Sequence, residues 1–148
     1  MIQEVFILYI HQVRIRPIAF QVVLIVYVIK YQYRSNKMSK QLEKAERYLR
    51  SAGMSFFVYR IEEILLNINN LTAKEEKSRL IKKYFENQDG YFDKNIGGTR
   101  TRVYSVIKII EENNVEYVLN KIIKSKKASS DIITKAKKIL EQHFKNDF

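Results

Sequence analysis

The pattern of hydrophobic and polar positions along the chain changes character at Met38. Residues 1–37 are mostly apolar and aromatic, with a single acidic residue, Glu4. From Met38 onward, apolar residues recur every three or four positions among charged and amide side chains, which is the period of an amphipathic helix. The change predicts two parts, an apolar segment over residues 1–37 and a helical domain over residues 38–148.

Apolar stripes at helical spacing divide the second part into a series of short helices. The second helix also carries Phe56 and Leu66 outside its stripe, so we expect it to be the most buried. The expected inward positions are, helix by helix, Leu42, Ala45, Leu49 and Ala52; Phe57, Ile61, Ile64, Leu65 and Ile68; Leu80, Ile81, Tyr84 and Phe85; Val103, Val106, Ile107 and Ile110; Val115, Val118, Leu119, Ile122 and Ile123; and Ile132, Ile133, Ala136, Ile139, Leu140 and Phe144. The pattern predicts an all-α fold, a compact bundle of about six short amphipathic helices preceded by the apolar segment.

Local signals predict where several of these helices begin and end. Gly53 is placed to end the first helix, and Ser55 to cap the second. Thr72 and Glu75 have the spacing of a capping box and predict the start of the third. Thr99 is expected to cap the fourth helix after a Gly-Gly turn.

The apolar segment contains a run of thirteen residues without a charge, residues 17–29. As a helix this run would span roughly 20 Å, which is short of the roughly 30 Å hydrocarbon core of a bilayer. Three interpretations stay open. Residues 17–33 could anchor the protein in a membrane, or the run could be buried in a soluble fold as a helix or as a β-branched strand. The reading frame could also be over-extended, with the functional start at Met38.

The charges around the apolar run indicate an orientation for the membrane alternative. Lys30, Arg34, Lys37 and Lys40 follow the run closely. Under the positive-inside rule they would place the C-terminal domain in the cytoplasm. We therefore expect a cytoplasmic protein, or a membrane-associated one whose C-terminal domain is cytoplasmic.

The overall charge narrows the classes of partner. Formal net charge is +11 at pH 7 and the sequence pI is about 9.7. An anionic partner, such as nucleic acid or lipid headgroups, is the natural expectation, although a high lysine content can also be incidental. The chain has no cysteine, which excludes disulfides, thiolate metal sites and cysteine nucleophiles.

The first candidate site is a potential phosphate site at Gly97, Gly98, Thr99, Arg100 and Arg102. Glycines before a helix let the first backbone amides face outward, and a helix N-terminus attracts anions. The two arginines add charge-assisted donors for phosphate oxygens. The segment matches neither a Walker loop nor a dinucleotide fingerprint, and an ordinary turn with a cap and two solvated arginines would give the same pattern.

The second candidate site is a run of lysines near the C-terminus. Its members are Lys121, Lys124, Lys126, Lys127, Lys135, Lys137 and Lys138. Only Asp131 opposes them over residues 121–138, and residues 124–127 are expected to link the last two helices. Lysines without arginine or asparagine favour contact with phosphates over reading of bases. A solvated helix face is the alternative.

Tyr91 and Phe92 form an aromatic pair in the irregular stretch over residues 87–98. On a flexible loop, such a pair could dock on a partner or stack on single-stranded bases. It could equally fold back onto the end of the bundle.

No motif of a catalytic, metal or cofactor site is present. The two histidines, His11 and His143, are far apart in sequence and indicate neither a triad nor a zinc site. A calcium loop counted from Asp93 would need a bidentate Glu at its twelfth position, where Tyr104 stands. We therefore expect a protein that is not an enzyme and that uses no cofactor and no metal.

Together these patterns predict a small, basic, non-catalytic helical protein that binds nucleic acid mainly through phosphate contacts, in an accessory or regulatory role. One alternative is a helical interaction module tethered to a membrane by residues 17–33, with its basic face on acidic lipids. Another is a soluble adaptor or inhibitor that binds a protein partner.

Overall fold

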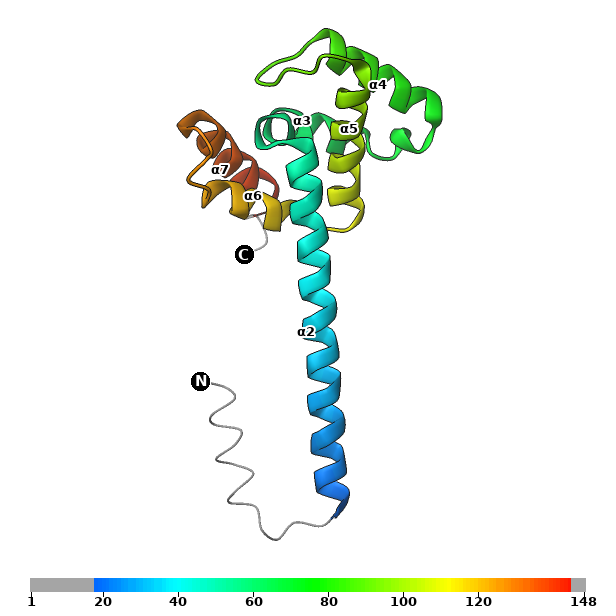
Figure 1. The fold of residues 1–148 in the computed structure, drawn as a ribbon, viewed down its shortest axis with the longest axis vertical. Helices are drawn as coiled ribbons and strands as arrows, with labels where there is room; N and C mark the ends of the chain where they lie inside the picture. The colour runs from blue at the N-terminus through cyan, green and yellow to red at the C-terminus, as the bar shows by residue number, and fades with distance from the viewer. Residues whose placement is uncertain (1–17, 145–148) are drawn as a thin grey trace. The chain divides into compact units, whose positions relative to one another are not determined.

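The computed structural model describes residues 18–144 of the chain, with side chains from Val23 onward (Figure 1). The first part of the apolar segment, including His11 and Pro17, lies outside the described residues. The described elements are α2 (Ile18–Ala52), α3 (Met54–Asn67), the 3-10 turn η1 (Asn70–Thr72), α4 (Lys74–Glu86), α5 (Ile96–Glu111), α6 (Val115–Ile123) and α7 (Ser130–Phe144). All of them are helical, so the predicted all-α fold is confirmed.

The chain divides into two units after Ser39, and α2 runs through both. In the first unit residues 18–39 are helical, so the strand alternative does not occur there. Apolar side chains of this helix are open to solvent: Val23 is 66% and Tyr27 is 70% exposed. The alternative of a segment buried in a soluble core is therefore not observed for these side chains. Among residues 18–144, no helix combines the length and the apolar character needed to cross a membrane.

The second unit has one continuous hydrophobic core. Helix α3 is central to it, since it packs against both α5 and α7, while α6 packs on α7 and α4 packs on α5 (Figure 1). The last turns of α2 add Ala45, Leu49 and Ala52 to the core. Burying these stripes removes apolar surface from water, which is the main term that holds short helices together.

Helix α3 confirms the expected stripe but not every expected buried position. Phe56, Phe57, Ile61 and Ile64 are fully buried. Leu66 is 83% exposed, so its predicted burial is wrong. Leu66 is offset from Ile64 by two positions, which turns it about 200° around the helix and away from the core.

The junction between α2 and α3 is tighter than the sequence suggested. Gly53 does end α2, with a positive φ of 80°, and its amide donates to the Leu49 carbonyl at 2.8 Å. Helix α3 then begins at Met54 with Gly53 itself at the N-cap. Ser55 lies inside the first turn, so the prediction that it caps α3 is wrong.

The predicted starts of α4 and α5 also need correction. Ala73 stands at the N-cap of α4 without a side-chain cap, and the Thr72 hydroxyl donates instead to the Asn69 carbonyl at 3.2 Å. The capping box therefore does not form. Helix α5 begins at Ile96, three residues before Thr99, which excludes Thr99 as its cap.

Candidate anion-binding surface

The start of α5 is built around the cap residue Asn95. Its side chain accepts a hydrogen bond from the Gly98 amide at 3.2 Å, so Gly97 and Gly98 form the first turn instead of a separate turn before the helix. A Cβ on Gly98 would lie 2.8 Å from Oδ1 of Asp93. The glycine is therefore needed because the Asp93 carboxylate approaches the helix backbone closely.

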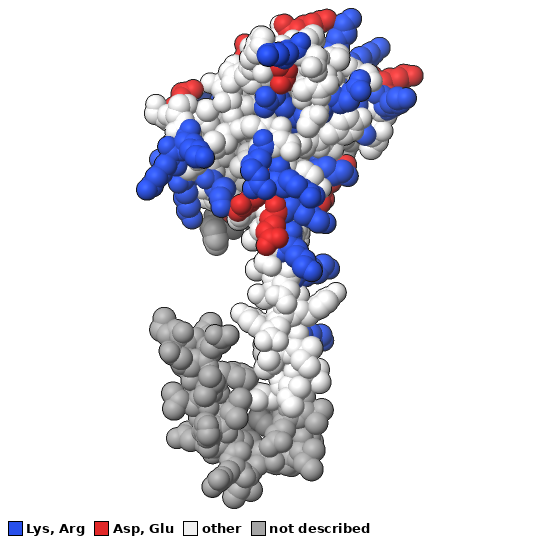
Figure 2. All heavy atoms as spheres, viewed as in Figure 1, with Lys and Arg blue, Asp and Glu red and all other residues white. Residues whose placement is uncertain are grey.

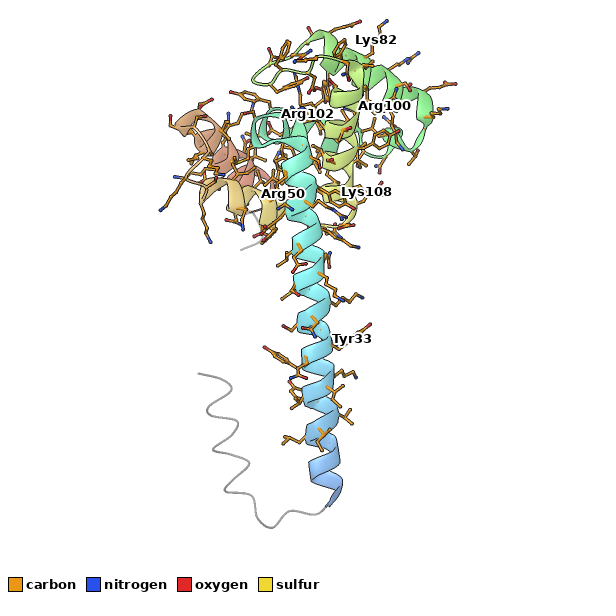
Figure 3. All side chains as sticks on the ribbon, viewed as in Figure 1. Tyr33, Arg50, Lys82, Arg100, Arg102 and Lys108 are labelled. Atoms are coloured by element: carbon orange, nitrogen blue, oxygen red, sulfur yellow. The ribbon has the colours of Figure 1, made fainter. Side chains whose placement is uncertain are left out.

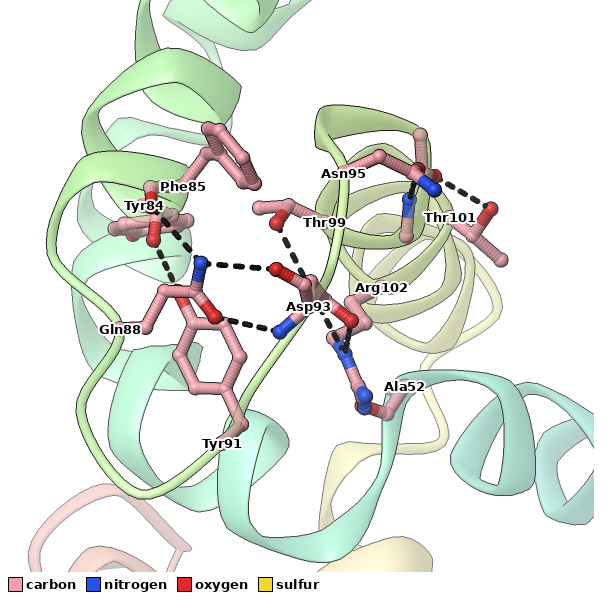
Figure 4. Close-up of polar contacts among 12 residues, drawn as sticks. Ala52, Tyr84, Phe85, Gln88, Tyr91, Asp93, Asn95, Thr99, Thr101 and Arg102 are labelled. Carbon is pink, nitrogen blue, oxygen red and sulfur yellow. Dashed lines mark hydrogen bonds and ion pairs between the residues drawn. The ribbon is translucent and has the colours of Figure 1, made fainter.

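Asp93 already occupies the position that the sequence suggested for a phosphate (Figure 4). The hydroxyl of Thr99, which is fully buried, donates to Oδ2 of Asp93 at 2.9 Å. Nε of Arg102 lies 3.0 Å from both carboxylate oxygens, and its Nη1 donates to the Ala52 carbonyl. The side chains of Thr99 and Arg102 therefore already bind the Asp93 carboxylate. Arg100 is the exposed cation of this candidate site.

The loop between α4 and α5 separates the aromatic pair. Tyr91 folds inward: its ring packs edge-on against Phe56 with centroids 4.8 Å apart, and its hydroxyl donates to the Tyr84 carbonyl (Figure 4). Burial raises the pKa of Tyr91. Phe92 is 75% exposed. The alternative that the pair folds back onto the bundle is therefore confirmed for Tyr91, while docking or stacking by Phe92 stays a prediction.

Within the lysine run, Lys121 forms an ion pair with a carboxylate on α2. Its Nζ lies 2.7 Å from Oε1 of Glu46, and the Tyr117 hydroxyl donates to the same oxygen at 2.7 Å. These two hydrogen bonds lower the pKa of Glu46, and the bond to Glu46 raises the pKa of Lys121.

The residues that connect α6 to α7 carry the unpaired part of the run. Lys124, Lys126 and Lys127, hereafter the lysine link, are exposed and make no ion pair within residues 18–144. Lys135 is partly buried, with Nζ 4.5 Å from the centroid of the Tyr59 ring. Lys137 and Lys138 are exposed on α7.

An open groove of about 640 Å³ lies where the end of α2, the start of α3 and α6 meet. Its lining residues are Glu46, Leu49, Arg50, Gly53, Met54, Lys121, Lys124 and Ser125, hereafter the basic groove. Figure 3 shows Arg50 near α6, so a cation from α2 joins two cations from the lysine run. The groove contains none of the residues predicted at the start of α5.

Arg50 is a groove residue that the sequence pattern does not predict. It lies more than seventy positions before Lys121 and Lys124, and its own helix gives no signal beyond an i,i+4 spacing to Glu46. A shallower hollow on α2 extends the same surface and includes Lys40, Lys44 and Arg47 among its lining residues. Figure 2 shows Lys and Arg side chains gathered over these parts of the second unit, with acidic residues between them.

The chemistry of this surface is that of a charged binding site. Exposed ammonium and guanidinium groups can donate to phosphate or carboxylate oxygens. Nε2 of His143 lies 3.4 Å from Oε1 of Glu62, but no cluster of three metal-binding side chains occurs within residues 18–144. Comparison with known proteins finds no family model, no curated protein and no solved structure that matches this chain.

Proposed function

We propose that this protein binds nucleic acid, mainly through phosphate contacts made by the basic groove and the lysine link. The observation that carries the proposal is a set of exposed lysines without carboxylate partners: Lys124, Lys126 and Lys127 make no ion pair within the described chain. Arg50 adds a fourth exposed cation, which lines the basic groove together with Glu46. A phosphate polymer would supply the missing negative charge.

The distribution of acidic residues supports this assignment. On α4 a lysine does find a carboxylate, since Nζ of Lys83 lies 2.5 Å from Oε1 of Glu63. Residues 121–138 contain one acid, Asp131, and its carboxylate accepts a hydrogen bond from the Tyr59 hydroxyl at 3.3 Å. The three lysines of the lysine link therefore have no carboxylate that offsets their charge within the described chain.

The contacts would be electrostatic and independent of sequence. Lysine ammonium groups contact phosphates as point charges and carry little information about bases. Binding would release counterions, so affinity would fall steeply with salt. Such a protein would act as an accessory or regulatory factor without catalysis.

Two matched triple variants of the full-length protein test the proposal. The test variant carries Lys124→Ala, Lys126→Ala and Lys127→Ala, and the control carries Lys74→Ala, Lys82→Ala and Lys94→Ala, on α4 and the loop that follows it. Both lose the same charge, so a difference between them reports position and not net charge.

The measurement is fluorescence anisotropy of a labelled oligonucleotide at several salt concentrations. We expect the test variant to lose at least about tenfold in affinity and the slope of log affinity against log salt to become shallower by about 2 to 3. The control should stay within about twofold of the original protein at moderate salt, because surface charges beyond a Debye length are screened. Equal losses of affinity in the two variants would mean that binding depends on net charge alone and would contradict the assignment of the site to the basic groove and the lysine link.

A second candidate function is favoured by the first unit. The apolar helix over residues 23–33 exposes most of its side chains, with Tyr27, Tyr31 and Tyr33 each more than 60% exposed, while Leu24 and Val28 are half-buried. An exposed apolar helix surface favours an apolar environment, and tyrosines and lysines suit the interface of such an environment with water. This observation supports a helical module that associates with an acidic lipid bilayer through residues 17–33, with its C-terminal domain in the cytoplasm.

Vesicle flotation separates the two candidates. If lipid is the partner, the full-length protein floats with vesicles that contain an anionic phospholipid, Val26→Asp abolishes flotation, and Asn36→Asp, which makes the same change of charge on a polar exposed position, retains it. Absence of flotation by the unmodified protein would remove this candidate.

A further inference from the structure

The basic groove differs from a plain phosphate site because part of its lining is apolar. Leu49 belongs to the hydrophobic core and is 9% exposed, and Met54 packs against that core from the first turn of α3. A phosphate group gains nothing from contact with these side chains. The lining therefore indicates that an apolar group enters together with the charge.

The carboxylate of Glu46 gives a second indication. It lines the groove next to Lys121 and would repel a phosphate placed against it. A carboxylate oxygen is instead a suitable acceptor for the amino groups on the edges of bases. The groove thus offers cations at Arg50 and Lys124, an acceptor at Glu46, and an apolar floor.

We infer that the basic groove accepts an unpaired base, with the flanking phosphates on Arg50 and Lys124, and that the protein prefers single-stranded nucleic acid. This inference rests on the proposed function and specifies its substrate class. The volume of about 640 Å³ lies within the range of small-ligand pockets, roughly 300–1,000 Å³. In a duplex the bases stay stacked and paired, whereas a single strand can turn a base outward without an unpairing cost.

Arg50 has a particular part in this arrangement. Its guanidinium is planar, so it can stack on the face of a base or grip a phosphate with two donors. The other two cations of the groove, Lys121 and Lys124, are point charges on flexible stems. A base held between the Arg50 plane and the Met54 side chain would satisfy both the apolar and the charged parts of the groove.

The test measures the affinity of the full-length protein for three labelled ligands by fluorescence anisotropy. The ligands have the same length, and all three are measured at the same ionic strength. They are a single-stranded oligonucleotide, the corresponding duplex, and a strand of the same sugar-phosphate units without bases. We expect the single strand to bind roughly tenfold more tightly than either of the others, in line with stacking of one base.

Met54→Gln keeps the length of the side chain but makes the floor polar. It should lower single-strand affinity about threefold to tenfold and leave the base-free strand unaffected, while Leu66→Gln, on the exposed face of the same helix, should change neither. Equal affinity for the three ligands would overturn the inference and leave the phosphate function standing. No binding to any of them would overturn both.

Discussion

Arg102 and Asp93 form a largely buried polar contact that ties the α4–α5 loop to the end of α2 and to α5. Nε of Arg102 lies 3.0 Å from both carboxylate oxygens, and the same guanidinium donates to the Ala52 carbonyl at the end of α2 (Figure 4). One side chain thus joins the end of α2, the loop and α5. Only 9% of the Asp93 side chain and 23% of the Arg102 side chain are exposed.

Asp93→Ala should therefore destabilise the domain by about 2 to 4 kcal/mol, because it leaves a largely buried guanidinium and the Thr99 hydroxyl without their acceptor. Urea denaturation followed by circular dichroism measures the loss. Arg100→Ala is the control, since Arg100 is exposed and its loss should change stability by less than about 0.5 kcal/mol. Equal stability of the two variants would show that the Asp93 contact contributes little.

This contact also decides how the start of α5 can be tested for anion binding. A double variant of Arg100 and Arg102 would lower stability as well as charge. Arg100→Ala alone changes the exposed charge and leaves the internal pair intact. If Arg100→Ala lowers the affinity for an oligonucleotide and leaves the free energy of unfolding unchanged, Arg100 contacts a phosphate at the start of α5.

Gly53 is a second position where the end of α2 meets Arg102. Its φ is +80°, and a Cβ there would lie 2.7 Å from Nη1 of Arg102. We expect Gly53→Ala to cost about 1 to 2 kcal/mol of unfolding free energy, from left-handed backbone strain and displacement of the guanidinium. Ser51→Ala, at an exposed helical position two residues earlier, should be nearly neutral in the same urea titration.

The buried and the exposed face of α3 predict opposite effects of an aspartate substitution on stability. Ile64 is fully buried and Leu66 is 83% exposed. Ile64→Asp should unfold the domain at room temperature, because a carboxylate would be placed in the core without a partner. Leu66→Asp should keep the helical circular dichroism spectrum and the thermal midpoint close to those of the unmodified protein. A folded Ile64→Asp variant would contradict the assignment of the core.

These residues show what the sequence could and could not predict. Ile64 follows from periodicity, since core positions repeat with the helical period whatever the neighbouring helices are. The expected burial of Leu66 was wrong because apolar character alone does not fix which way a side chain points. Local cap signals failed at Ser55 and Thr72 for a similar reason: a hydroxyl near a helix start does not cap unless the backbone turns at that residue.

The candidate site shows a different limit. The lysine link could be found from the sequence because it is a continuous run with one opposing acid. The groove could not, because it depends on Arg50 of α2 and Lys124, which follows α6, lining the same hollow. The contact between Arg102 and Asp93 also depends on the conformation of the α4–α5 loop, which no local sequence pattern specifies. Periodicity predicts which face of each helix is buried, but a binding site depends on which helices pack against one another.

Glu46 predicts a dependence of stability on pH. Its pKa is lowered by hydrogen bonds from Lys121 and Tyr117, so its contribution is fully present above the ordinary carboxyl range, about pH 4 to 5, and is lost as the pH falls through the lowered value. The difference in unfolding free energy between the unmodified protein and Glu46→Gln should accordingly be larger near about pH 7 than near about pH 3. Glu43→Gln, on the same helix, is the control. A difference that does not change with pH would mean that the contribution of Glu46 does not depend on its charge.

Glu46→Gln also separates the electrostatic contribution to nucleic-acid affinity from the contribution of base contacts. In the unmodified protein the Glu46 carboxylate neutralises Lys121 and faces any phosphate that approaches the basic groove. Glu46→Gln releases that lysine and removes a repulsion, while the amide can still accept a hydrogen bond from a base. We expect affinity for a single-stranded oligonucleotide to rise about twofold to fivefold at low salt and the salt dependence to steepen by roughly one phosphate contact. Because the gain is electrostatic, it should fade at high ionic strength, and Glu75→Gln on α4, outside the groove, should not reproduce it. A loss of affinity in Glu46→Gln would instead mean that the carboxylate holds Lys121 in its binding position, so that the pair acts as one polar group of the groove.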